Sequence, residues 1–176
     1  RLWRSKLCGY YGQVMERDGL LRLWTNCGWG EEEDFPNAPR GFGLRYGKQR
    51  YAQVLTSTDG LNWDSPTLHS IDCNGSTANN LIFTDGMEGT FLYEAHAPEQ
   101  ERWKYVGTLR REEGRGIGVR ASADGVHWQP PKPWIFPVFG DSQNVCYFDE
   151  GLGRYVLYFR SFTGRPNAAV EAVAVD

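Results

Sequence analysis

The sequence lacks the features that would point to a membrane, a nucleic acid or a metal. It holds no run of about 18 apolar residues, the length that a membrane-spanning helix needs, so we expect no membrane partner. Its 19 basic and 22 acidic residues are interspersed without a basic stripe, which argues against a nucleic-acid partner. His69, His96 and His127 are isolated, and neither His-x-x-x-His nor Cys-x-x-Cys occurs. We therefore expect no metal site and no cofactor.

Cysteine is also scarce. The chain has four: Cys8, Cys27, Cys73 and Cys146. Two interpretations stay open: four buried or unpaired thiols, or one disulfide in an exported protein. The spacing does not decide between them. An extracellular or periplasmic location is slightly favoured, but the compartment is not determined.

No stretch shows a helical period with caps, whereas signals for strands and turns are frequent. Aromatic residues make up 14% of the chain, which also holds 21 Gly and 9 Pro. Aromatic residues suit pleated, half-buried surfaces, and Gly and Pro punctuate hairpins, so both biases favour an all-β fold. Asp18-Gly19 between apolar runs predicts a type I′ hairpin turn, and residues 25–50 are predicted to form a loop. Ten strands are predicted, at 12–15, 20–24, 51–56, 81–83, 89–93, 103–109, 116–121, 143–148, 154–160 and 169–175.

One seven-residue motif occurs twice. Ser-x-Asp-Gly-x-x-Trp stands at 57–63 and again at 122–128. In each copy we expect the Asp side chain to accept hydrogen bonds from turn N–H groups and the Gly to take a φ that other residues avoid. Asp59 and Asp124 are therefore interpreted as turn residues rather than catalytic ones. The match continues beyond Trp at three further pairs: Gly75 and Gly140, Asn79 and Asn144, Phe83 and Phe148.

The motif marks units that share an internal order. A first strand is followed by a middle strand, and a third strand then runs into the Ser-x-Asp-Gly turn. Residues 81–83 and 145–148 are predicted to be the first, innermost strands of the second and third units. The units cover about 9–68, 74–133 and 139–176, and the third ends where another such turn would begin. Repeating sheets of three to four antiparallel strands predict a β-propeller, here a single partial domain that belongs to a larger protein.

These turns resemble the hairpin turns of five-bladed β-propellers related to glycoside hydrolase families 32 and 43. The resemblance covers nearly the whole chain and implies that about three of five blades are present. Three further stretches look like bacterial members of this group: Leu-Leu-Arg-Leu-Trp at 20–24, Ala-Asn-Asn-Leu-Ile-Phe at 78–83 followed by 97–104, and Gly-Asp-Ser-Gln-Asn at 140–144 through 155–160.

The resemblance implies a funnel at the propeller axis, where the family's enzymes place three carboxylates. One acts as base or nucleophile, one stabilises the transition state and one is the general acid. Carried over by position, the inner strands here start near 11–13, 79–80 and 141–144, and the family's Asp-Pro signature is absent from all three. Asp141 is the one carboxylate among them, so it is a catalytic candidate or else a loop cap. Glu94 is the second catalytic candidate and could face the funnel or solvent.

Four residues are candidate substrate contacts: Asn79, Asn80, Asn144 and Arg160. The asparagines could bind sugar hydroxyls or make a hydrogen bond shared by each blade. Arg160 could clamp a carboxylate or hydroxyl, or pair with a neighbouring blade. Four tryptophans could stack on a sugar face or fill the core: Trp24, Trp29, Trp103 and Trp134.

Two function classes remain open at this point. The first is a glycosidase that hydrolyses carbohydrate with acidic residues at the central funnel. The alternative is a non-catalytic carbohydrate-binding or scaffolding propeller, which fits asparagine at positions where acids are expected. Carbohydrate is the expected ligand or substrate in both.

Overall fold

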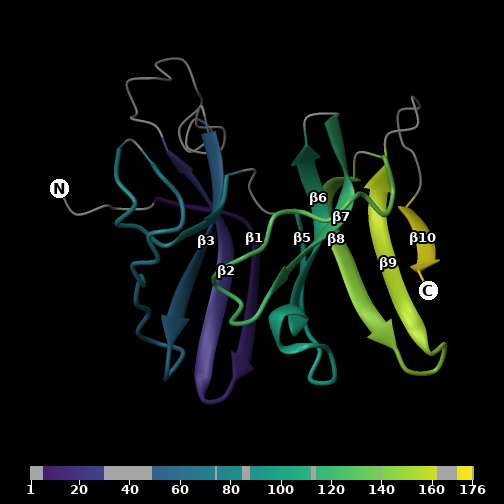
Figure 1. The fold of residues 1–176 in the computed structure, drawn as a ribbon, viewed down its shortest axis with the longest axis horizontal. Helices are drawn as coiled ribbons and strands as arrows, with labels where there is room; N and C mark the ends of the chain where they lie inside the picture. The colour runs from purple at the N-terminus through teal and green to yellow at the C-terminus, as the bar shows by residue number, and fades with distance from the viewer. Residues whose placement is uncertain are drawn as a thin grey trace. The chain divides into compact units, whose positions relative to one another are not determined.

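The computed structural model describes residues 6–29, 49–73, 75–84, 88–111, 114–138, 140–161 and 170–175. Within these ranges the side chains of 6–10, 28–29, 49–50, 111, 141, 161 and 170–175 lie outside the description. The chain divides into two compact units, Arg1–Met87 and Glu88–Asp176, both drawn in Figure 1. The prediction of an all-β fold is confirmed, because the described residues form antiparallel sheets and, besides them, one short 3-10 helix, η3 (Glu99–Glu101). No helix among the described residues is long and apolar enough to cross a membrane.

The first unit holds one four-stranded antiparallel sheet in the order β1-β2-β3-β4. Its strands are β1 (Lys6–Arg17), β2 (Leu20–Trp29), β3 (Gln49–Ser57) and β4 (Leu81–Phe83). The predicted type I′ turn between β1 and β2 is confirmed, since Asp18 and Gly19 have φ values of 56° and 75°. A Glu16 carboxylate oxygen accepts a hydrogen bond from the Gly19 N–H at 2.8 Å and holds the turn.

The predicted loop over 25–50 is wrong at its start, because β2 continues to Trp29. Thr25, Asn26 and Cys27 pair with residues of β3 and are buried. These small and polar residues carry no apolar alternation of their own. Their strand conformation therefore depends on the hydrogen bonds that β3 supplies from a distant part of the chain.

The second unit holds two three-stranded antiparallel sheets. One is β5-β6-β7, formed by β5 (Gly89–Tyr93), β6 (Trp103–Arg111) and β7 (Gly114–Ser122). The other is β10-β9-β8, formed by β8 (Gly140–Asp149), β9 (Arg154–Ser161) and β10 (Val170–Val175). A shared apolar core packs the two sheets together. Its buried residues come from β6, β7, β8 and β9: Val106, Ile117, Cys146, Leu157 and Phe159.

The prediction that Leu81–Phe83 is the first strand of the second repeat is wrong. This segment is β4, which pairs with Ala52 and Gln53 of β3 and completes the first sheet. The counterpart of β8 is β5, since each is the first strand along the chain of a three-stranded antiparallel sheet. The equal spacing that aligns Phe83 with Phe148 therefore does not reflect an equal place in the fold.

The proline-rich segment after the second turn takes the place that β4 has in the first sheet. It is extended and runs beside β7, with N–H groups of Gln129, Lys132 and Ile135 donating to β7 carbonyls at 2.9, 2.9 and 2.8 Å. Phe136 bridges to Ile117 of β7. Proline is tolerated at a sheet edge, where only part of the backbone must donate. The structural counterpart of Phe83 is thus Phe136.

Both Ser-x-Asp-Gly turns have the predicted construction. Asp59 Oδ1 accepts hydrogen bonds from the N–H groups of Leu61 and Asn62 at 2.8 Å each. Asp124 Oδ1 accepts two in the same way, also at 2.8 Å. Gly60 and Gly125 have φ values of 73° and 76°, which a residue with a Cβ avoids. The interpretation of both Asp residues as turn residues is confirmed.

Candidate functional site

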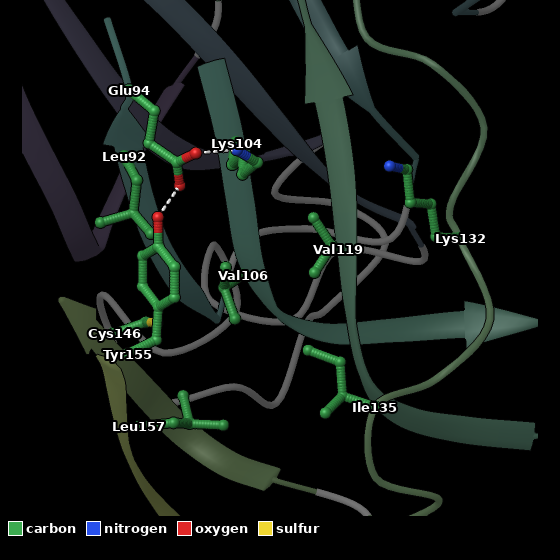
Figure 2. Close-up of a pocket in the computed structure, with 10 residues that line it drawn as sticks. All are labelled: Leu92, Glu94, Lys104, Val106, Val119, Lys132, Ile135, Cys146, Tyr155 and Leu157. Carbon is green, nitrogen blue, oxygen red and sulfur yellow. Dashed lines mark hydrogen bonds and ion pairs between the residues drawn. The ribbon is translucent and has the colours of Figure 1, made fainter. Parts of the chain in front are cut away.

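Glu94 follows the end of β5 and joins the two sheets of the second unit. Its backbone N–H donates to the Arg102 carbonyl at 2.8 Å, which extends the β5–β6 pairing by one step. One carboxylate oxygen accepts a hydrogen bond from the Lys104 ammonium of β6. The other accepts one from the Tyr155 hydroxyl of β9, as Figure 2 shows. One carboxylate therefore ties β6 to β9.

A cavity of about 260 Å³ lies beside this group. Its polar residues are Glu94, Lys104, Tyr155 and, toward the edge segment, Lys132. Figure 2 shows Lys132 across the cavity from Glu94, and its ammonium pairs with a Glu101 oxygen of η3 at 2.8 Å. The remaining wall is apolar and is formed by Leu92, Val106, Val119, Ile135, Cys146 and Leu157.

Burial and the neighbouring carboxylate set the protonation of the groups around Glu94. Burial raises the pKa of Tyr155, and the hydrogen bond to Glu94 and its charge raise it further, so the phenol stays protonated and donates. Burial and the charge of Glu94 raise the pKa of the Cys146 thiol to about 11. A thiolate is the reactive form of cysteine, so Cys146 is an inert wall residue at neutral pH.

This arrangement suits binding better than proton transfer. Each oxygen of Glu94 already accepts a hydrogen bond, one from an ammonium and one from a phenol. These two partners fix the carboxylate in position, and its remaining lone pairs can still accept hydrogen bonds from a ligand. The group instead offers fixed donors and acceptors beside an apolar wall. That is the usual composition of a small-molecule pocket.

Asp141 and Arg160, two further predicted site residues, stand opposite each other in the β8–β9 ladder. The side chain of Asp141 lies outside the described residues, and Arg160 is exposed. Tyr155, which holds Glu94, is near the other end of β9, roughly 16 Å from Arg160 at about 3.3 Å per residue. Asp141 and Glu94 each stay a catalytic prediction.

The three predicted asparagines are buried and hydrogen-bonded within their own units. Asn79 donates to the Ile71 and Ser76 carbonyls at 2.9 and 3.0 Å and holds the loop before β4. Asn80 donates to the Val54 carbonyl at 2.7 Å. Asn79 and Asn80 belong to the first unit, whereas the residues that line the Glu94 cavity belong to the second. Their role in sugar binding stays a prediction.

Asn144 lies in β8 and links the two sheets of the second unit. Its amide donates to the Glu88 carbonyl and to the Thr108 hydroxyl, the latter at 3.2 Å. Its backbone carbonyl accepts a hydrogen bond from the Thr90 hydroxyl at 2.8 Å. The predicted register of Asn79 with Asn144 is wrong, because Asn79 precedes an edge strand and Asn144 lies within a first strand.

Three of the four candidate tryptophans pack within the protein. Trp24 and Trp103 are 0% and 3% exposed. Trp134 covers Gly116, where an added Cβ would lie 2.6 Å from its ring. Trp29 has a side chain outside the described residues.

Lys104 and Tyr155 are site residues that the sequence does not single out, although one of them carries a signal. The β5–β6 hairpin places Leu92 opposite Lys104, so Glu94 is a diagonal neighbour on the same ladder. Tyr155 has no such signal. Its contact with Glu94 depends on how two separate sheets pack. Among the described residues, no cluster of three or more His, Cys, Asp or Glu could hold a metal ion.

Neither a family model nor a curated protein matches the chain. Among solved structures, it is similar to the crystal structure of an N-acetylgalactosamine deacetylase from F. plautii in complex with blood group B trisaccharide. The TM-score is 0.50 at 11% sequence identity, over 88% of this chain and 45% of that one. The chain thus spans less than half the length of this neighbour. At this identity the likeness concerns the fold alone.

Proposed function

We propose that this chain is part of a carbohydrate-binding β-propeller. The observation that carries the proposal is the fold likeness over 88% of the chain to an N-acetylgalactosamine deacetylase that was crystallised with a trisaccharide. Repeated antiparallel sheets that end in the same Ser-x-Asp-Gly turn support a propeller. So does the resemblance of these turns to those of glycoside hydrolase families 32 and 43.

Binding is preferred over hydrolysis because of how Glu94 is held. The Lys104 ammonium and the Tyr155 hydroxyl each donate to one of its carboxylate oxygens and fix it in position. Glycoside hydrolysis is the second candidate, favoured by the sequence resemblance. In that case Asp141, at the start of a predicted inner strand, would be the essential acid.

A glycan array probed with the full-length protein tests the proposal. We expect saturable binding to at least one glycan, and Arg160→Ala to weaken it at least about tenfold, as for loss of a charged hydrogen bond. Arg154→Ala is the matched control, since Arg154 is exposed on the same strand. No saturable binding to any glycan would refute carbohydrate binding. Equal losses in both variants would remove Arg160 as a specific contact.

Hydrolysis is tested on the same protein with a panel of aryl glycosides. If hydrolysis is the function, Asp141→Asn should abolish turnover while Glu94→Gln leaves part of it. Turnover that persists unchanged in Asp141→Asn would exclude Asp141 as the essential acid.

A further inference from the structure

The cavity beside Glu94 is apolar on most sides and polar at one edge. Leu92, Val106, Val119 and Leu157 form the apolar wall, and Glu94 and Lys104 form the polar edge. Solvent reaches this edge, since the side chains of Glu94 and Lys104 are 24% and 20% exposed. Ile135, at the edge segment, is 36% exposed. A molecule can therefore approach the cavity from outside the core.

The size of the cavity fits one ring. A cavity of about 150 Å³ lined by aliphatic side chains is enough to hold benzene, and it stays dry when empty. The cavity here measures about 260 Å³, which leaves room for one aromatic ring and a polar substituent. Water gains little against the apolar wall, so an apolar group is the better occupant.

The polar edge presents donors and acceptors together. A carboxylate oxygen can accept more than one hydrogen bond, and an ammonium has three N–H donors. Glu94 therefore has acceptor sites beyond its bonds to Lys104 and Tyr155, and Lys104 has N–H donors beyond its bond to Glu94. A hydroxyl group both donates and accepts, so it matches this edge better than a purely cationic or anionic group.

We propose that the cavity receives the apolar aglycone of a glycoside, an aromatic ring or short alkyl chain, with an attached hydroxyl or glycosidic oxygen at the Glu94–Lys104–Tyr155 edge. This inference rests on the proposed carbohydrate function, to which it adds the class of ligand. It places the apolar part of the ligand between the two sheets of the second unit.

Small probes test the cavity without any sugar. Toluene and benzyl alcohol are titrated into the full-length protein with ¹³C-labelled Leu, Val and Ile methyl groups, and methyl shifts are followed by NMR. We expect saturable shifts at Leu92, Val119 and Leu157 with both probes. Val119→Phe should fill the cavity and remove the shifts at Leu92 and Leu157. Val14→Phe, a change of the same kind at a residue that is 51% exposed in β1, should leave them unchanged.

The polar edge is tested by Tyr155→Phe, which keeps the ring and removes the hydroxyl. Benzyl alcohol should bind the unmodified protein more tightly than toluene, and the variant should reduce this preference by about 2- to 10-fold, the range for one hydrogen bond. This arm stays decisive if Val119→Phe does not fold. A preference that is unchanged in Tyr155→Phe would overturn the role of the polar edge.

The outcomes separate this inference from the proposed function. No saturable shifts with either probe, together with a higher melting temperature of Val119→Phe, would show a packing defect and overturn the inference. Methyl shifts that persist in Val119→Phe would place the probes elsewhere and also overturn it. Binding of the probes without glycan binding on the array would refute carbohydrate recognition while leaving the cavity a site for apolar groups.

Discussion

The two Ser-x-Asp-Gly turns are nearly identical in their hydrogen bonds and differ in what surrounds them. In the first, Ser57 Oγ donates to Asp59 Oδ1 at 3.0 Å, and in the second Ser122 Oγ donates to Asp124 Oδ1 at 3.0 Å. The buried Gly125, unlike Gly60, lies against Trp103. The same seven-residue pattern thus forms an exposed turn in one unit and a packed turn in the other.

The chain also leaves the two turns by different routes. After the first, a long excursion precedes β4, which brings Phe83 opposite Ala52. After the second, a shorter proline-rich segment brings Phe136 opposite Ile117. Local hydrogen bonds determine the turn, whereas pairing between distant segments determines the path of the chain after it. Substitutions in the turns and in the segments after them can separate these two effects.

The largest effect is expected from alanine substitutions of the phenylalanines that follow the turns. Phe83 is 1% exposed, so Phe83→Ala should lower the free energy of unfolding by about 3–5 kcal/mol. Phe136 is half-buried and stacks on Phe159 with ring centroids 6.0 Å apart, so Phe136→Ala should lower the free energy of unfolding by about 2 kcal/mol. Phe148 is 50% exposed, so Phe148→Ala should lower it by less than about 1 kcal/mol. Denaturant unfolding measures all three. If Phe148→Ala lowered stability as much as Phe83→Ala, the two residues would be structurally equivalent, as their equal spacing after the turns predicts.

The same phenylalanines mark the limit of what the sequence predicts about the fold. The ten strands, the Asp18-Gly19 turn and the Ser-x-Asp-Gly turns are predictable because their signals are local: alternation, turn residues and a side chain that bonds its own backbone. The predicted place of Leu81–Phe83, as the first strand of the second unit, is wrong. A short apolar run does not encode which strand it pairs with, and the equal spacing of Phe83 and Phe148 after the two turns suggests an equivalence that the fold does not have.

The candidate site shows the same limit. Glu94 is identifiable as a charged residue at a strand end, and Lys104 could be found from the register of the β5–β6 hairpin. The contact of Glu94 with Tyr155 joins two sheets across the core, and no pattern within either sheet encodes it. The cavity between the sheets depends on side-chain shapes that meet only after packing.

Alanine at the turn glycines should separate the packed turn from the exposed one. Both have positive φ values, so each Gly→Ala should cost about 1–2 kcal/mol of stability. At Gly125 the added Cβ would also lie 3.0 Å from the Trp103 ring, against 3.4 Å from a flexible Leu21 methyl at Gly60. Overpacking adds about 1–3 kcal/mol, so Gly125→Ala should be clearly the worse in thermal unfolding. Equal costs would mean that Trp103 moves aside freely.

A smaller loss of stability is expected when Asp124 is protonated at low pH. Burial raises its pKa, but hydrogen bonds from His127 and the turn N–H groups outweigh this and lower the pKa from 3.8 to about 2. A depressed pKa means that the stabilisation is present above the ordinary value and is lost as pH falls from there through about 2. The side chain is 49% exposed, so the loss should be below about 1 kcal/mol.

The free energy of unfolding is measured between about pH 5 and about pH 2, the range in which such carboxylates titrate. Asp124→Asn should flatten this dependence. Asp18→Asn is a matched control, since Asn fits the positive φ at that turn. An unchanged slope in Asp124→Asn would show that the hydrogen bonds do not depend on the charge.

The smallest effect is expected where the two turns differ in sequence but not in contact. Asn62 Nδ2 donates to Asp59 Oδ2 at 2.8 Å, and His127 Nδ1 contacts Asp124 Oδ2 at 2.7 Å. His127→Asn should therefore preserve the turn and change stability by less than about 0.5 kcal/mol, as for most exposed positions. His127→Ala removes the contact with Asp124, and its unfolding free energy is compared with that of His127→Asn in the same assay. If His127→Asn were as costly as His127→Ala, the imidazole would supply something that the amide of the first turn does not, and the two turns would be equivalent in shape only.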